Sequence, residues 1–406
     1  MNRLLLFVTC CLSLNLAAQE SLKGEYWYEL GNVNGEWNQL FIPNHITKEV
    51  QGNYSALRIY SIRSNGDTLE TPFVIRNNLP VEERTEIDFE LYNKSEKDGW
   101  KYFTFKTDGK EKLNKVNLEV SDSDFDHRIV FEGSNDGREW FTILKDYRIL
   151  SLYKDNINFR YTDLEFPSSR YSFFRLQLPS DLEFQRAYLS GTIEEGGEVE
   201  EKRVDFDYLE NDERQQSEIY IRLNEYQPIH SFAITMDEEI DYFRNASLYY
   251  LNDSSFYKDE WHKNFKKIYS GDLTSVRQHI QNFHPVFTTE LKFVIYNGNN
   301  QSLNVRDIEV KGNRNSMIAR FNKENARHFL VYSDKTFGKA YYDIEKFREN
   351  IPENLSNLEL GRAMFHPFPQ QEKEPFFQSN WWIWGILILL IVLIGRFTVQ
   401  MLKDGV

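Results

Sequence analysis

Apolar and polar residues alternate in short runs along most of this chain, and turn dipeptides separate the runs. Alternation with a period of two is typical of strands that bury one face, and aromatic residues, 15% of the chain, favour strands. A spacing of roughly 8 to 15 residues between runs is typical of sandwich domains. We therefore predict an all-β fold from runs that include YFTFKT, VNLEV, SFFRLQL, EIYIRL, SFAITM, ASLYYL, LKFVIYNG and NVRDIEV.

Two stretches predict β-hairpins. ALRIYSI and TLETPFVI flank residues 64–67, where Asn-Gly suits a type I′ turn, and RIVFEGSNDGREWFTIL carries its turn at residues 135–137. Helical periodicity is scarce. The best candidate is YYDIEKFREN, in which Asp343 would cap a turn or two with Ile344 and Phe347 on one side.

Both ends of the chain carry apolar segments. Residues 1–18 have a basic start, an apolar centre and small residues before Gln19, which predicts a secretory signal peptide rather than a lipidation signal. Residues 381–399 predict a single transmembrane helix with a tryptophan belt, and Arg396 snorkels to the far interface. The positive-inside rule then puts the tail, 400–406, in the cytoplasm and the preceding chain outside the cytoplasm. A buried core helix is the alternative for this segment.

Charge and cysteine content exclude several classes of function. Both cysteines, Cys10 and Cys11, lie in the predicted leader, so disulfides, thiolate nucleophiles and cysteine-bound zinc are excluded after cleavage. A net charge of −14 argues against a nucleic-acid partner, which requires a basic face.

Composition changes suggest where domains begin and end. The acidic stretch 193–201 is the best internal linker, 80–86 is a weaker one, and the proline-bearing segment 367–379 predicts a stalk before the span. The stretches 91–192 and 203–312 end in similar strand patterns, which suggests two copies of one sandwich fold. We therefore predict an N-terminal β region, two sandwiches, a C-terminal β/helical segment with the stalk, and the span, at 19–90, 91–192, 203–312, 313–379 and 381–399.

The segment EGSNDGREWFTIL, followed by YTDLEFPSSRYSFFRLQL, resembles the discoidin or coagulation-factor type C domain, a galactose-binding-like jelly roll. This resemblance covers about a hundred residues. The residues agree with this resemblance: Trp140, which follows the turn, is expected to fill the sandwich interior, and alternation along the strand that contains Arg175 turns Phe174, Leu176 and Leu178 inward. Tandem jelly-roll sandwiches are thus the expected architecture.

A wider likeness covers nearly the whole chain. LRIYSIRSNGDTLETPFVI, YFRNASLYYL, YNGNNQSLNVRDIEV and the single C-terminal span resemble a bacterial membrane-anchored family known as domain of unknown function 3999. The resemblance implies an envelope protein of Gram-negative bacteria. It implies no activity, cofactor or substrate.

Motifs for catalysis and metal binding are scarce. The histidines form no HExxH motif, GxSxG is absent, and His279 and His284 lack a third zinc ligand, which favours surface or loop histidines. Acidic groups at 194–195 and 237–239 define no glycosidase pair by themselves. Residues 122–126 (DSDFD) fit a structural calcium loop or a solvated loop, but not an EF-hand. We assign no catalytic, metal or cofactor residue, and expect no enzyme.

Binding is the chemistry that remains. Jelly rolls recognise ligands with loops, and aromatic rings stack on sugars; the candidates here are Trp100, Tyr102, Tyr153 and Tyr161, for which ordinary sandwich packing is the alternative. Our leading hypothesis is a membrane-anchored envelope interaction or scaffold protein that binds a membrane protein or an envelope glycan. A carbohydrate-binding module is the second hypothesis, and a hydrolase with an unrecognised site is the third.

Overall fold

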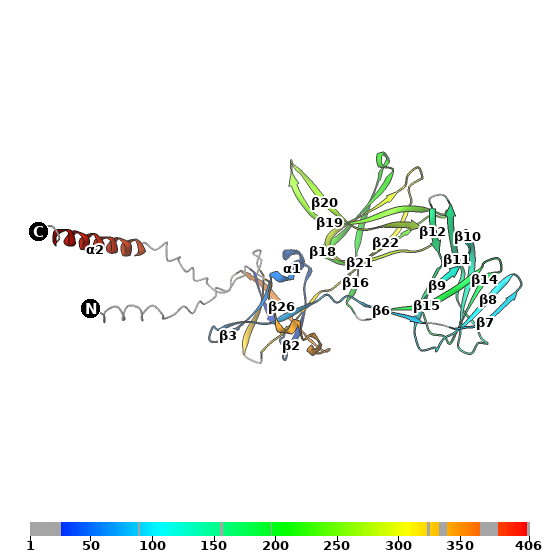
Figure 1. Ribbon diagram of the computed structural model, residues 1–406, viewed down its shortest axis with the longest axis horizontal. Coiled ribbons are helices and arrows are strands. Elements are labelled where there is room, and N and C mark those ends of the chain that lie inside the picture. Colours follow the sequence, from blue (N-terminus) through cyan, green and yellow to red (C-terminus); the bar gives the residue numbers. More distant parts are fainter. Residues whose placement is uncertain are drawn as a thin grey trace.

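The computed structural model describes residues 26–87, 90–154, 157–195, 197–322, 325–332, 339–365 and 381–403. Strands dominate these residues and gather into several sheets (Figure 1). The predicted all-β class is therefore confirmed. The predicted leader, 1–18, and the predicted stalk, 367–379, lie outside the described residues, as does the end of the predicted tail.

Both ends of the described β structure build one unit, called here the terminal unit. Its strands are β1 (Tyr26–Gly31), β2 (Trp37–Phe41), β3 (Leu57–Arg63), β4 (Thr68–Glu70), β5 (Phe73–Arg76), β23 (Ser316–Arg320), β24 (Ala326–Tyr332), β25 (Ser356–Asn357) and β26 (Glu359–Phe365). Helix α1 (Asn44–Glu49) and the 3-10 turn η1 (Tyr54–Ala56) follow β2. One sheet has the order β26-β1-β24-β3-β4, and the other has the order β25-β2-β23-β5.

Strand pairing joins the two ends of the chain directly. Strand β1 lies between β24 and β26, and Leu40 and Ile59 share a buried core with Met317 and Leu330. Composition predicts separate segments for residues 19–90 and 313–379. In the structure, described residues from both segments share two sheets and one core.

The first unit is a sandwich made by one continuous stretch. Its strands are β6 (Val81–Ile87), β7 (Glu90–Lys97), β8 (Trp100–Lys106), β9 (Leu113–Val120), β10 (Phe125–Ser134), β11 (Phe141–Lys154), β12 (Ile157–Tyr161), β13 (Asp163–Ser169), β14 (Phe173–Pro179) and β15 (Phe184–Glu195). A six-stranded sheet, β12-β11-β10-β14-β8-β7, shares a core with a four-stranded sheet, β13-β9-β15-β6. Phe174, Leu176 and Leu178 are all buried in this core, as predicted.

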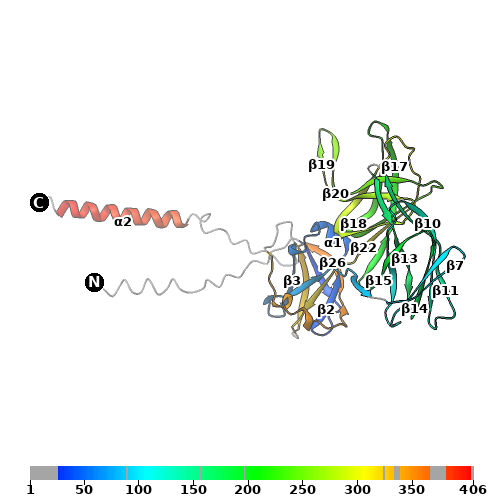
Figure 2. The ribbon, with the colours of Figure 1, turned by 45° about the vertical axis from the view of Figure 1, so that its right-hand side comes forward.

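The second unit is one seven-stranded sheet. It contains β16 (Val199–Lys202), β17 (Val204–Asn211), the 3-10 turn η2 (Asp212–Arg214), β18 (Gln216–Met236), β19 (Phe243–Tyr257), β20 (Glu260–Thr274), β21 (His279–Tyr296) and β22 (Val305–Asn313). The order is β16-β22-β18-β21-β19-β20, with β17 on β18. The pairing of β18 with β21 has two register shifts, and the sheet surrounds one buried core. The hairpin of β19 and β20 projects from this unit in both ribbon views (Figures 1 and 2).

Three chain crossings are hydrogen-bonded together where the units join. The side-chain amide of Asn78 donates to the carbonyl of Arg314 at 2.7 Å, and the N–H of Glu198 donates to the carbonyl of Asn78 at 2.9 Å. Gly197 has φ +83°, and a Cβ there would lie 2.7 Å from the nitrogen of Pro80. This crossing therefore requires glycine.

Several local predictions are wrong in detail. Only Gly66 of the first hairpin turn has positive φ, so the turn is not type I′, although β3 and β4 do pair. The predicted helix after residue 340 is two 3-10 turns, η3 (Asp343–Glu345) and η4 (Arg348–Asn350). Asp343 caps neither turn, and Phe347 is exposed while Ile344 is buried. The weaker linker at 80–86 is mainly strand β6, and β15 and β16 occupy most of 193–201.

Helix α2 (Trp381–Lys403) covers the segment for which a transmembrane helix was predicted. Among the described residues, none of the helices is long and apolar enough to cross a membrane. The span therefore stays a prediction.

Candidate functional site: an arginine platform on the first unit

The outer face of the six-stranded sheet carries a cluster of polar and aromatic side chains. Strand β14 alternates, so the register that buries Phe174 and Leu176 turns Arg175 and Gln177 to the opposite face. Arg175 is paired with Glu132 of β10 on one side and with Thr104 of β8 on the other. The sheet therefore fixes the positions of these side chains.

Trp140 lies on this outer face, which corrects the prediction that it fills the core. The indole is half-buried, and the guanidinium carbon of Arg175 lies 4.0 Å from its ring centre. The loop before Trp140 is folded by Asp136, whose carboxylate accepts the N–H groups of Arg138 and Glu139 at 2.8 and 2.9 Å. These hydrogen bonds hold the pKa of Asp136 below its usual value.

The core has another occupant in place of the indole. The ring centres of Phe131 and Phe174 lie 5.4 Å apart in a stacked pair, and both rings are fully buried. Phe166 packs against them with its ring centre 5.2 Å from that of Phe131. Phe131, Phe166 and Phe174 thus belong to the buried core of the first unit.

Glu132 holds the guanidinium of Arg175 in place with hydrogen bonds. Its Oε2 accepts Arg175 Nε at 2.7 Å, Arg175 Nη2 at 2.7 Å and Gln177 Nε2 at 2.7 Å. The Glu132 side chain is only 11% exposed, so this pair is screened little by solvent. Tyr102 flanks the guanidinium on β8, with its ring centre 5.9 Å from the guanidinium carbon. We call Tyr102, Glu132, Trp140, Arg175 and Gln177 the arginine platform.

The platform combines aromatic faces with fixed charged groups. Aromatic rings present flat apolar surfaces, and charge-assisted hydrogen bonds give direction. Among the described residues, no donor reaches Oε1 of Glu132, and Nη1 of Arg175 is not used by Glu132. One acceptor and one donor are therefore available beside two aromatic rings.

Of the four aromatic residues predicted as candidates, only Tyr102 belongs to the platform. Trp100 begins β8 and is half-buried, and Tyr153 on β11 is exposed. The hydroxyl of Tyr161 is hydrogen-bonded to the hydroxyl of Tyr147, and burial raises the pKa of Tyr161. Glu132 and Gln177 were missed, although the alternation of β14 already places position 177 beside position 175 on the outer face.

The acidic loop at 122–126 makes contacts that use its carboxylates. Arg148 donates to Asp126 at 2.8 and 2.6 Å and also to Asp241 of the second unit at 2.7 Å. These hydrogen bonds lower the pKa of both aspartates. Asp122 accepts the N–H of Glu183 at 2.8 Å. The loop thus helps to join two units.

The histidine predictions are partly wrong. His279 is buried, whereas His284 on the same strand is exposed, as expected for a surface residue. Within the described part of the chain, no three or more His, Cys, Asp or Glu side chains form a group suited to a metal ion. Of the acidic stretches, Glu238 accepts the N–H of Asn304 at 2.7 Å.

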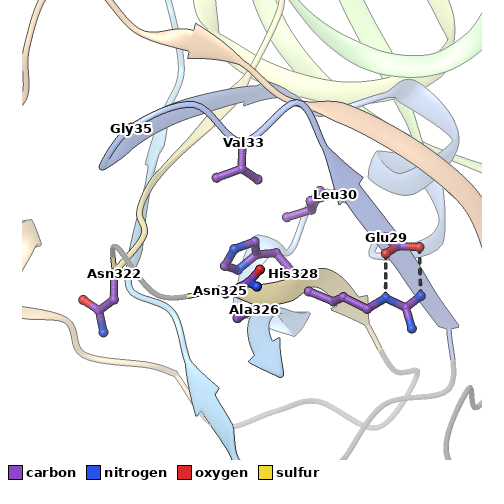
Figure 3. Close-up of a pocket in the computed structure, with 9 residues that line it drawn as sticks. Glu29, Leu30, Val33, Gly35, Asn322, Asn325, Ala326 and His328 are labelled. Atoms are coloured by element: carbon purple, nitrogen blue, oxygen red, sulfur yellow. Dashed lines mark hydrogen bonds and ion pairs between the residues drawn. The ribbon is translucent and has the colours of Figure 1, made fainter. Parts of the chain in front are cut away.

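A cavity of about 430 Å³ lies at the edge of the terminal unit (Figure 3). At its rim, Arg327 donates to both oxygens of Glu29 at 2.8 and 3.0 Å. His328 lines it, with Nδ1 2.7 Å from Ser61 Oγ. Such a pair resembles a nucleophile and its base. However, Ser61 is buried, does not line the cavity and also bonds to Thr71 Oγ1 at 2.6 Å, so this contact holds the imidazole in place.

Comparisons with known proteins give weak similarities. No protein-family model matches the chain, so membership in the family of unknown function 3999 is not shown, and no curated protein matches. Among solved structures, the CBM32-1 and CBM32-2 domains of Clostridium perfringens ZmpB align with 68% of this chain and 100% of that chain, at 5% identity and a TM-score of 0.20. A fucolectin from Morone saxatilis serum aligns with 70% and 98%, at 8% identity and a TM-score of 0.22.

One further solved structure is a glycoside hydrolase 29 family member from an unknown rumen bacterium. It aligns with 54% of this chain at 16% identity and a TM-score of 0.21, and the match spans only 40% of that protein. At such scores no activity or ligand follows for this chain.

Proposed function

We propose that this chain is a non-catalytic binding protein whose first unit recognises a glycan with the arginine platform. The observation that carries the proposal is the position of Trp140 on an outer sheet face, stacked on a guanidinium that Glu132 holds at 2.7 Å. Rings that are fixed before a ligand arrives lose little conformational freedom on binding.

The platform offers the groups that a sugar ring requires. The aromatic surfaces of Trp140 and Tyr102 suit the C–H face of a pyranose, which is apolar. The remaining acceptor on Glu132 and the remaining donor on Arg175 suit neighbouring hydroxyls. The proposal is for binding without bond cleavage.

A glycan array probed with the detergent-solubilised full chain tests the proposal. Wild-type protein is expected to bind a defined set of sugars, and Trp140→Ala is expected to lose that signal. Tyr153→Ala removes an exposed aromatic ring elsewhere on the unit, so it is expected to retain binding. Loss in both variants, or in neither, would contradict the platform as the site.

A protein partner on the same face is the other outcome of this experiment. An array without signal, together with a partner protein that binds wild type but not Trp140→Ala, would replace the glycan by a protein of the envelope. The hypothesis of an interaction or scaffold protein would then be the correct one.

We also propose that helix α2 attaches the β units to a membrane, with the units on the periplasmic side. Its described apolar side chains are exposed, with Trp384 65% and Leu393 45% accessible. A helix that is apolar on all sides is typical of lipid contact. Alkaline carbonate extraction of expressing cells is the test: wild type is expected in the membrane pellet, and Leu390→Asp is expected in the supernatant. Wild type in the supernatant would refute attachment.

A further inference from the structure

A cavity of about 360 Å³ lies where β18 ends and β21 begins in the second unit. We call it the loop-end pocket. Residues 234–236, 238 and 242 line one side, and residues 275–279 line the other. A volume of this size accommodates a ligand of about one sugar ring. The pocket shares no residue with the arginine platform.

His279 lines this pocket and carries a buried, unsatisfied polar atom. The residue is only 4% exposed, and within the described structure its Nε2 has no hydrogen-bond partner. Burial, together with the charge of Arg277, lowers the pKa of His279 to about 4. A buried nitrogen without a partner is unfavourable, so a ligand that supplies one gains a hydrogen bond that the free protein lacks.

Arg277 brings a free positive charge to the same pocket. Its side chain is exposed, and among the described residues it makes no hydrogen bond or ion pair. The nearby carboxylates are engaged elsewhere. Glu238 Oε1 accepts two hydrogen bonds from Asn304, at 2.7 and 3.2 Å, and Asp241 is paired with Arg148 at 2.7 Å.

An unpaired guanidinium is a notable feature in a chain with a net charge of −14. Guanidinium groups bind carboxylates through two parallel hydrogen bonds, which favours a carboxylate over a neutral group. Ser275 and Thr235 add hydroxyl groups to the lining, and Tyr242 adds a ring. The pocket thus offers one cationic donor in Arg277, the carboxylate of Glu238 held by Asn304, several neutral polar groups and one aromatic surface.

We propose that the loop-end pocket binds a small hydroxylated carboxylate of about one sugar ring in size, such as a uronate. Arg277 pairs with the carboxylate, and His279 Nε2, which is buried in the free protein, makes a hydrogen bond to the ligand once the imidazole turns toward the cavity. The site is separate from the glycan platform of the first unit and does not depend on it.

Titration calorimetry of the detergent-solubilised full chain with D-galacturonate tests this inference, with D-galactose as the matched neutral probe. Galacturonate is expected to bind at least tenfold more tightly than galactose. Arg277→Gln is expected to lose at least tenfold in affinity for galacturonate. Arg306→Gln changes another exposed arginine, on β22, and is expected to bind as wild type does.

Two outcomes would overturn the inference. The first is absence of galacturonate binding at millimolar concentration, and the second is binding that Arg277→Gln leaves unchanged. Trp140→Ala identifies the site independently, because it is expected to leave galacturonate binding intact. If Trp140→Ala removed that binding, the acid would lie on the platform, and the proposed pocket would be wrong while glycan recognition stood.

Discussion

The arginine platform and the loop-end pocket differ in whether their polar groups have hydrogen-bond partners within the protein. On the platform, Glu132 satisfies Arg175 and Gln177 with hydrogen bonds of 2.7 Å, so the charged groups are part of the folded structure. In the pocket, Arg277 and the Nε2 of His279 lack such partners among the described residues. Platform substitutions should therefore reduce both stability and binding, whereas pocket substitutions should mainly reduce binding.

The largest effect is expected for Glu132→Ala. Removal of this carboxylate leaves Arg175 without its partner, and since Arg175 is 25% exposed we expect a loss of about 2 to 3 kcal/mol in unfolding free energy. The midpoint of the urea transition measures it, with Glu139→Ala as the exposed control. A loss as small as that of the control would mean that the two sites do not differ in this way.

His279 gives the next largest effect, through pH. Its pKa in the folded chain, about 4, lies below the usual value of 6.5, so the unfolded state binds more protons between these values. Stability contributed by the neutral imidazole is complete above pH 6.5 and is lost as pH falls toward 4. A fall of about 2 kcal/mol is expected between pH 7 and pH 5.

Urea unfolding at the two pH values checks this prediction. His279→Gln is expected to remove that part of the pH dependence, and His284→Gln, on the exposed side of the same strand, is expected to retain it. Burial also lowers the pKa of His328, so a smaller dependence of the same sign remains in both variants. Identical profiles for the two variants would contradict the assignment.

Trp140→Ala separates stability from binding on the platform. The lost cation–π contact contributes about 0.5 to 1 kcal/mol, so the unfolding free energy should fall by no more than about 1 kcal/mol. Glycan affinity should fall at least tenfold. Unfolding and binding curves of Trp140→Ala and wild type, recorded on the same preparations, show whether the two losses separate. A loss of several kcal/mol in unfolding free energy would mean that Trp140 is a core residue.

The smallest effect is expected for Arg277→Gln. Since this exposed side chain makes no ion pair among the described residues, the unfolding free energy should stay within about 0.5 kcal/mol of wild type. The urea midpoint measures it. A clear loss of stability would mean that Arg277 contributes to the folded structure, as the charged groups of the platform do.

Periodicity predicted which side chains the strands bury, but it did not predict where loops place their side chains. The burial of Phe174, Leu176 and Leu178 followed from alternation alone, because a strand has only two faces. The place of Trp140 depended on hydrogen bonds from Asp136 within a loop, which leave no periodic signal. His279 was likewise placed at the surface, since nothing in its local sequence shows that other strands cover it.

Long-range strand pairing was also not predicted from the sequence. Strand β1 pairs with β24 and β26, which are separated from it by most of the chain. Alternation identifies each strand but not its partner, because many antiparallel pairings bury equivalent faces. For the same reason, the pairing of His279 with Ile234 on β18, which forms one wall of the loop-end pocket, was not foreseen.

The terminal unit has a consequence for how the protein is made. Strands β1 to β5 leave the ribosome early, yet β1 cannot gain its neighbours until β24 and β26 have been synthesised. Apolar residues such as Leu40 and Ile59 therefore remain uncovered while the two inserted units are completed. Nascent chains halted before Ser316 should be sensitive to protease in their N-terminal strands and should depend on chaperones, whereas the first unit can fold from one continuous stretch.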